Sequence, residues 1–108
     1  MDELMVDLSY VLQCCSRKLL DKDDKALEWY IYEEHEIGTG LLNSEVFKPL
    51  IMHNKVSKSV YEQMKRLGSK SKVLFESELE RNADVLRSNS DWLEIYSLSD
   101  SIFQSIDW

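Results

Sequence analysis

The stretch Asp-Asp-Lys-Ala-Leu-Glu-Trp-Tyr-Ile-Tyr-Glu-Glu-His-Glu-Ile-Gly, residues 23–38, decides the fold of this chain. It is apolar enough to need a hydrophobic core, yet it carries six carboxylates. On a helical wheel, one side of it carries Leu27, Tyr30, Ile31 and Ile37, and the other side carries Lys25, Trp29, Tyr32 and Glu36. Such a helix is either sandwiched at the centre of a domain or displays aromatic side chains beside acids on an outer surface.

Chain length and composition set the fold class around this helix. At 108 residues, 44% of them hydrophobic and 31% charged, residues 1–108 form one globular domain. Three glycines and one proline are too few for the many turns of an all-β domain. The sequence therefore predicts an all-α fold, a compact bundle of five or six short helices that pack antiparallel through short connections.

Apolar spacing and capping residues place the helices of the first half. A first helix is expected over residues 2–20, followed by a polar loop from which Asp23 or Asp24 caps the central helix. Gly38 is expected to end that helix, in a turn over residues 38–40. Because proline fits the first turn of a helix, the next helix either begins near Lys48 or is kinked at Pro49.

The second half contains three further helical patterns. Ser57 or Ser59 is expected to cap a helix that Gly68 ends, before a polar linker over residues 69–72. From Ser71 onward an apolar stripe predicts a helix that reaches residue 86. Ser90 is expected to cap the last helix, although residues 98–102 fit irregular or extended backbone equally well.

The charge of the chain restricts its partners. A net charge of −7 and a pI near 4.8 argue against nucleic acid as the main ligand and suit a basic protein partner, although many proteins are acidic for solubility alone. Residues 1–47 have net charge −7, residues 48–72 have +6, and residues 73–108 have −6. The basic middle either pairs with its acidic flanks or forms a positive patch of its own.

Catalytic, metal and targeting motifs are missing from the sequence. Cys15 falls on the apolar stripe of the first helix, where burial makes a thiol inert, and Cys14 is expected to be partly exposed with no activating group nearby in sequence. Neither His35 nor His53 has the glutamate three residues earlier that a di-iron site needs. We expect no enzyme activity, no metal and no cofactor. The N-terminus lacks a signal peptide pattern, no segment is long and apolar enough to span a membrane, and the cysteines suit the reducing cytoplasm.

Aromatic residues interleaved with acids indicate a protein-binding surface. Aromatic side chains supply interface hot spots, and carboxylates accept bidentate hydrogen bonds from arginine. Trp92 and Tyr96 are better explained as core residues, whereas Trp29, Tyr32 and Trp108 are hard to bury together. The predicted partner-binding residues are Glu28, Trp29, Tyr32, Glu33, Glu36, Asp91, Glu94, Asp100, Asp107 and Trp108.

In length, acidity, helical character and the acidic-aromatic stretch from Glu28 to Glu36, the chain resembles the small helical immunity proteins that bacteria encode beside nuclease toxins. These include the immunity proteins of contact-dependent growth inhibition systems and of the colicin D type. The resemblance implies a cytoplasmic inhibitor in bacterial competition, which acts as an antitoxin by binding the basic substrate groove or active site of a cognate toxin.

Two other functions fit the sequence. Residues 55–72 contain six basic side chains and a glycine between two helical patterns, so they are compatible with a helix-turn-helix in a small DNA-binding regulator. A helical adaptor subunit with no toxin partner fits the composition as well.

Overall fold

The computed structural model describes residues 2–108, and these residues form helices and connecting segments without any β-strand. The α-helices are α1 (Asp2–Gln13), α2 (Asp24–Trp29), α3 (Glu36–Leu42), α4 (Pro49–Met52), α5 (Lys58–Phe75), α6 (Ala83–Ser88) and α7 (Ser90–Gln104). A 3₁₀-helix, η1 (Arg17–Asp21), follows α1, and a π-helix, η2 (Tyr30–His35), joins α2 to α3 in one continuous rod. The predicted all-α class is confirmed.

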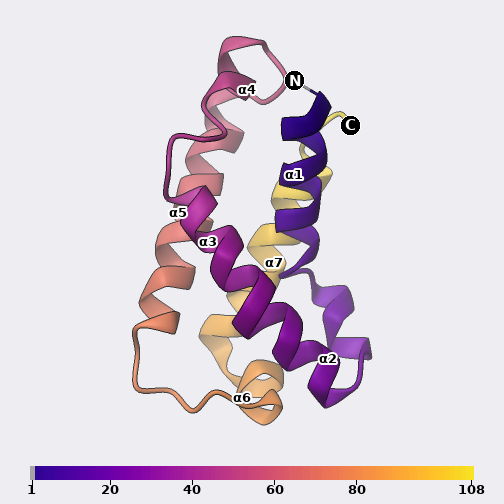
Figure 1. Cartoon of the computed structure of the whole chain (residues 1–108), viewed down its shortest axis with the longest axis vertical. Coiled ribbons are helices and arrows are strands. Elements are labelled where there is room, and N and C mark those ends of the chain that lie inside the picture. The colour runs from indigo at the N-terminus through magenta and orange to yellow at the C-terminus, as the bar shows by residue number, and fades with distance from the viewer. Residues whose placement is uncertain (1) are drawn as a thin grey trace.

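The helices form an elongated bundle of 40 × 24 × 19 Å. As Figure 1 shows, α1 and α5 run in one direction, whereas α7 and the rod made of α2, η2 and α3 run in the other. The two chain termini lie at one end of the bundle, and α2 and α6 lie at the opposite end. None of the helices described is long and apolar enough to cross a lipid bilayer.

Most predicted helix starts are confirmed by their caps. The Asp23 side chain accepts a hydrogen bond from the Ala26 backbone N–H at 2.8 Å, and Ser57 Oγ accepts one from the Val60 N–H at 3.1 Å. Pro49 occupies the first turn of α4 and does not kink a longer helix. The start of α7 is shifted by one residue, because the side chain of Asn89, and not that of Ser90, caps it.

The first predicted helix is too long, because α1 ends at Gln13 and residues 14–16 form a turn. In this turn Ser16 Oγ accepts a hydrogen bond from the Lys18 N–H and donates one to Asp100 Oδ1 at 2.8 Å. The turn therefore depends on α7, more than eighty residues away in the chain. It also buries Cys14, whose exposed fraction is 1%, so the expectation that this residue is partly exposed is wrong.

Gly38 and Gly68, which were expected to end helices, lie inside α3 and α5. A Cβ atom added to Gly68 would lie 2.9 Å from Leu42 Cβ, and the Gly68 carbonyl accepts a hydrogen bond from Asn43 Nδ2 at 3.0 Å. A Cβ atom on Gly38 would lie 3.1 Å from Val11 Cγ1 of α1. Both glycines let neighbouring helices approach closely. From sequence alone, a glycine with this role cannot be told from a glycine that ends a helix.

The π-helix changes which face of the central rod is buried. Leu27, Ile31, His35 and Thr39 are all buried at steps of four residues, which the wider turn of η2 permits. Ile37, which the α-helical wheel placed with Leu27 and Ile31, is 65% exposed. That expectation is wrong because it assumed α-helical geometry throughout the rod.

The predicted helix over residues 71–86 is also wrong. Helix α5 continues to Phe75, residues 76–82 form a connecting segment, and Asn82 caps α6 through a 2.9 Å bond from the Val85 N–H. Leu79, expected on the apolar stripe of that helix, is partly exposed in this segment. Residues 98–102, for which the sequence left three conformations open, are helical and belong to α7.

An aromatic cluster joins the central rod, α5 and α7. Trp92 is buried, and its ring centroid lies 5.4 Å from that of Phe75, 6.4 Å from that of Tyr96 and 6.5 Å from that of Tyr32. The hydroxyl of Tyr96 donates a 2.7 Å hydrogen bond to the Leu86 carbonyl. Trp92 and Tyr96 are therefore core residues, as the sequence favoured.

His35 lies inside this core, fully buried between α5 and α7. Its Nε2 atom lies 2.8 Å from Ser71 Oγ. Its Nδ1 atom has no hydrogen-bond partner among the described residues. Burial lowers the pKa of His35 to about 3, so the folded protein holds this side chain neutral.

The two helix-interior glycines Gly68 and Gly40 give a matched test of packing. We expect Gly68→Ala to lower the free energy of unfolding by about 1–3 kcal/mol, because the new methyl group meets Leu42. Gly40→Ala should raise it by up to about 1 kcal/mol, because a Cβ there meets no atom within 4 Å and alanine favours the helix. Urea denaturation measures both, and equal stability of the two variants would contradict the close approach of α3 and α5.

The buried His35 predicts a loss of stability in mild acid. The pKa of His35 is lower in the folded than in the unfolded chain. Its contribution to folding stability is therefore complete above the unfolded pKa near 6.5, and it is lost as the pH falls below 6.5. Between pH 7 and pH 5 the free energy of unfolding should fall by about 2 kcal/mol because of this residue. The variant His35→Gln should remove that part of the pH dependence, and His53→Gln, at an exposed position, should retain it. Urea denaturation at several pH values gives the comparison, and an unchanged slope in His35→Gln would refute the assignment.

Candidate protein-binding surface at the acidic end

Negative charge is concentrated at one end of the bundle. Residues 21–36 and 76–94, here called the acidic end, carry thirteen acidic and four basic residues, a net charge of −9. Together they comprise the last residue of η1, all of α2 and η2, the connection over residues 76–82, α6 and the start of α7. Helices α2 and α6 are in contact there (Figure 1). The rest of the chain has seven acidic and nine basic residues. The fold thus brings two acidic segments that are distant in sequence onto one surface.

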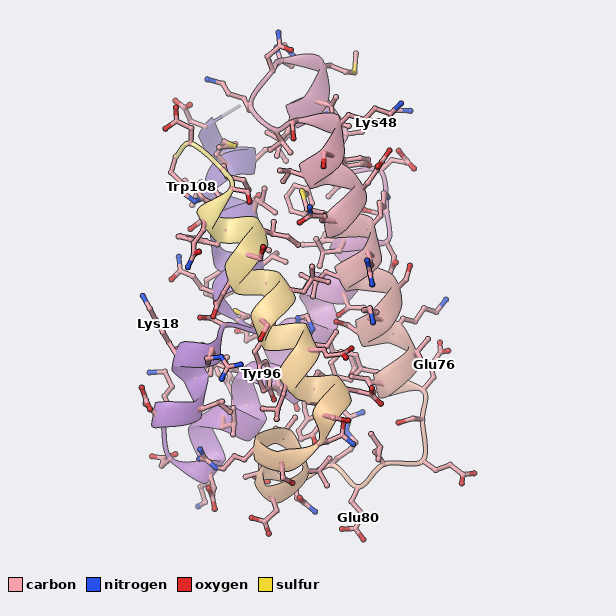
Figure 2. The ribbon with its side chains drawn as sticks, turned by 180° about the vertical axis from the view of Figure 1, so that it is seen from behind. Lys18, Lys48, Glu76, Glu80, Tyr96 and Trp108 are labelled. Carbon is pink, nitrogen blue, oxygen red and sulfur yellow. The ribbon has the colours of Figure 1, made fainter. Side chains whose placement is uncertain are left out.

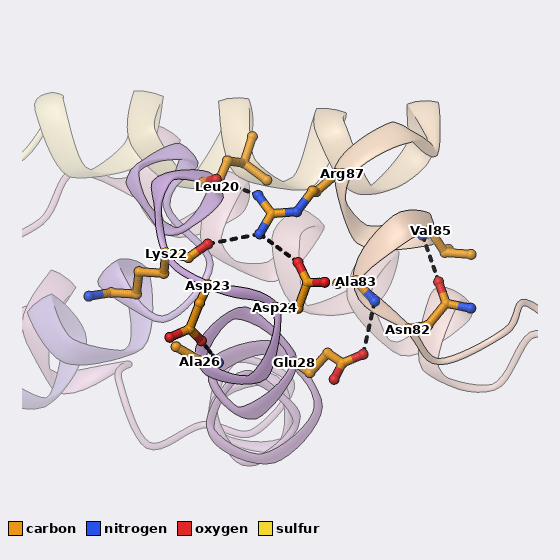
Figure 3. Close-up of polar contacts among 10 residues, drawn as sticks. All are labelled: Leu20, Lys22, Asp23, Asp24, Ala26, Glu28, Asn82, Ala83, Val85 and Arg87. Atoms are coloured by element: carbon orange, nitrogen blue, oxygen red, sulfur yellow. Dashed lines mark hydrogen bonds and ion pairs between the residues drawn. The ribbon is translucent and has the colours of Figure 1, made fainter.

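Arg87 fixes α6 to the start of α2, as Figure 3 shows. Its guanidinium donates hydrogen bonds to the Leu20 carbonyl, to the Lys22 carbonyl at 2.8 Å and to Asp24 Oδ1 at 3.2 Å. Glu28 Oε2 completes the junction by accepting a 3.0 Å hydrogen bond from the Ala83 N–H, at the start of α6. Because Arg87 donates to backbone carbonyls and to Asp24, it does not neutralise the other carboxylates of the acidic end.

Arg81 fixes the 76–82 connection to η2. Its guanidinium lies 2.8 Å from Glu36 Oε2 and donates a hydrogen bond to the Tyr32 carbonyl at 3.4 Å. The guanidinium carbon also lies 4.5 Å from the ring centroid of Tyr32 and 5.7 Å from that of Phe75. Both arginines of the acidic end are therefore engaged in internal contacts.

The acidic end retains exposed carboxylates that have no cationic partner. Within residues 2–108, those that are exposed and form no ion pair are Asp21, Asp23, Glu33, Glu76, Glu78, Glu80, Asp84 and Asp91. In Figure 2 the Glu80 side chain extends from the lower end of the molecule, and Glu76 lies at its right edge, where α5 ends. The surface is thus a patch of uncompensated negative charge.

The predicted residues of the central helix divide into two groups. Glu28, Tyr32 and Glu36 make internal contacts, with the Tyr32 hydroxyl donating a 3.4 Å hydrogen bond to the Asn82 carbonyl. Trp29 is 49% exposed, and Glu33, one turn further along the rod, is exposed as well. A partner is therefore free to contact Trp29 and Glu33 directly.

The predicted C-terminal residues do not form one surface. Asp91 lies at the acidic end, and Glu94 pairs with Lys70 at 3.4 Å. Asp100 lies further along α7, where it accepts hydrogen bonds from Ser16 and the Arg17 backbone N–H. Asp107 and Trp108 lie beyond α7, at the opposite end of the bundle (Figures 1 and 2), and the Trp108 indole donates to the Phe103 carbonyl at 2.9 Å.

Sequence reasoning missed Glu76, Glu78 and Glu80. The sequence predicted a helix over residues 71–86, whereas the structure places these glutamates in the connecting segment between α5 and α6. The signal that was present is the alternation of three glutamates over residues 76–80, which fits an exposed segment better than a helix with one buried face.

The basic middle of the sequence is partly neutralised by the fold. Lys65 and Lys48 lie 3.7 and 3.9 Å from Glu45 carboxylate oxygens, and Lys70 pairs with Glu94. Arg66 and Lys72 form no ion pair with any residue from 2 to 108. Pairing with the acidic flanks, one of the two alternatives left open by the sequence, is therefore confirmed for part of the segment.

Groups that resemble catalytic residues are inaccessible in this fold. The His35 and Ser71 side chains, which lie within hydrogen-bonding distance of each other, are fully buried. Burial raises the pKa of Cys14 to about 11 and that of Cys15 to about 12, so both thiols stay protonated. The part of the chain that the structure describes contains no group of three or more His, Cys, Asp or Glu side chains placed to hold a metal ion.

Comparison with known proteins found no match. No protein-family model, no curated protein sequence and no solved structure matches the chain.

Proposed function

We propose that this chain is a non-catalytic inhibitor of the immunity-protein kind, which neutralises a basic nuclease toxin in the cytoplasm by binding it through the acidic end. One observation supports the proposal above others, namely the set of exposed, unpaired carboxylates at the same end of the bundle as the exposed Trp29. A nuclease binds nucleic acid phosphates with a basic surface, and a rigid array of carboxylates is complementary to the same surface.

The proposed mechanism assigns two roles to this surface. Glu33, Glu76 and Glu78 stand in for phosphates, and their field speeds the approach of a basic partner. Trp29 provides the apolar anchor, since tryptophan is among the residues that contribute most when buried in an interface. Arg81 and Arg87 hold the surface in place from within, so that little ordering is needed on binding.

A helix-turn-helix regulator is less well supported. That function required a turn at Gly68, but α5 runs without a break from Lys58 to Phe75. Gly68 faces Leu42 and Asn43 instead of ending a helix. Lys65 and Lys70 are moreover engaged with Glu45 and Glu94, which leaves fewer cations for phosphates.

The first test is capture of the partner. The tagged chain is incubated with lysate from its native cells, with and without added nuclease, and the retained proteins are identified by mass spectrometry. We expect a basic protein at equimolar amount whose nuclease activity is blocked by the purified chain. Binding that disappears after nuclease treatment, or a retained nuclease that stays active in the complex, would overturn the proposal.

The second test locates the interface on the acidic end. Replacing Glu33, Glu76 and Glu78 by lysine should slow association at least about tenfold and flatten its dependence on salt. A control with lysine at the exposed Glu3, Asp7 and Glu62 makes the same change in net charge elsewhere and should associate nearly as fast as the wild type. Trp29→Ala should raise Kd at least about tenfold by faster dissociation. Equal effects of the two triple variants in stopped-flow measurements would remove the acidic end from consideration.

A further inference from the structure

A cleft of the molecule lies next to the acidic end, with which it shares Lys22 and Tyr30. It has a volume of about 750 Å³ and is lined by side chains from α1, η1, η2 and α7, at the place where α1 ends. Clefts of roughly 300–1,000 Å³ are the usual size for small-molecule sites. Glu33, Glu76 and Glu78, which are assigned to the protein partner, are not among the residues that line it.

Three aromatic rings line the cleft from three different elements. Tyr10 comes from α1, Tyr30 from η2 and Phe103 from α7. Tyr10 is half exposed, so its ring is accessible to a bound molecule. Aromatic walls of this kind favour a flat ring, which stacks or packs edge to face against them.

Two of the residues that line the cleft are positively charged. Lys18 and Lys22 line it, and neither forms an ion pair with residues 2–108. The Lys22 ammonium lies 5.5 Å from the Tyr30 ring centroid, so charge and aromatic wall are adjacent. In Figure 2 the Lys18 side chain extends from η1 at the edge of the molecule.

Carboxylates offset part of this charge, since Asp100 lines the cleft and Glu34 lies close to Tyr10 and Cys14. Asp100 is the one carboxylate among the residues that line it, and its two oxygens already accept hydrogen bonds, at 2.8 Å from Ser16 Oγ and at 3.3 Å from the Arg17 N–H. The Cys14 thiol stays protonated and neutral because burial raises its pKa to about 11. The cleft thus combines aromatic walls with two free ammonium groups in a chain that is acidic overall.

We propose that this cleft binds a small planar aromatic anion, with its ring between Tyr10, Tyr30 and Phe103 and its phosphate or carboxylate beside Lys18 and Lys22. The lysines supply the charge selectivity, and the rings supply the apolar contact area. The site shares Lys22 and Tyr30 with the acidic end, but its ligand is tested on the chain alone, so the test does not depend on whether the chain inhibits a toxin.

The test uses four probes with ¹⁵N-labelled full-length protein followed by NMR. AMP carries a planar ring and a phosphate, 2-naphthoate carries a planar ring and a carboxylate, adenosine lacks the anion and inorganic phosphate lacks the ring. We expect AMP or 2-naphthoate to shift the amide signals of the cleft residues with Kd below about 1 mM, and whichever binds more tightly identifies the anion. Adenosine and phosphate should each bind at least about tenfold more weakly.

Charge variants assign the binding to the lysines of the cleft. The double variant K18Q/K22Q should weaken binding of the favoured probe at least about tenfold, whereas K58Q/K72Q, at two exposed lysines on α5, should leave it unchanged. Circular dichroism melting checks that both variants remain folded. The proposal is overturned if neither anion binds below about 1 mM, if adenosine binds as well as AMP, or if the two double variants behave alike.

Discussion

The close packing of the α2–η2–α3 rod against α1 and α5 is the constraint on which the rest of the structure depends. At Gly38 and Gly68 the backbones approach so closely that a Cβ would meet Val11 and Leu42. This approach places His35 beside Ser71 and against the Trp92 ring, where burial keeps the imidazole neutral. Helix α7 then covers the remaining side of the core through Trp92 and Tyr96.

The π-helix in this rod links the core to both proposed binding surfaces. By widening one turn it keeps Ile31, His35 and Thr39 in the core, and it leaves Trp29 and Ile37 exposed. The adjacent Tyr30 lies in the wall of the cleft, with its ring 5.1 Å from that of Trp29 in an edge-to-face arrangement. A purely α-helical rod would present a different set of side chains at these surfaces.

The acidic end stays negatively charged because its two arginines make contacts within the fold. Arg87 donates to the carbonyls of Leu20 and Lys22, and Arg81 covers the Tyr32 ring, so both cations stabilise the junction between segments. The Arg81–Glu36 ion pair is half exposed and contributes little to stability by itself. Because these arginines are occupied internally, glutamates of the 76–82 connection remain free for a partner.

The sequence by itself determined the helical class, several helix starts and the excess of negative charge. Asp23, Ser57 and Pro49 act within one turn of their own backbone, and Trp92 and Tyr96 are large apolar residues at helical spacing, so local pattern was sufficient for them. Only the tertiary structure decided the roles of Gly38 and Gly68, the end of α1 at the Ser16–Asp100 contact and the exposure of Ile37. It also separated Trp29 and Glu33, which remain open to a partner, from Glu28, Tyr32 and Glu36, which bond within the chain. The physical reason is that these features depend on contacts between residues far apart in the sequence, which neither propensity nor periodicity encodes.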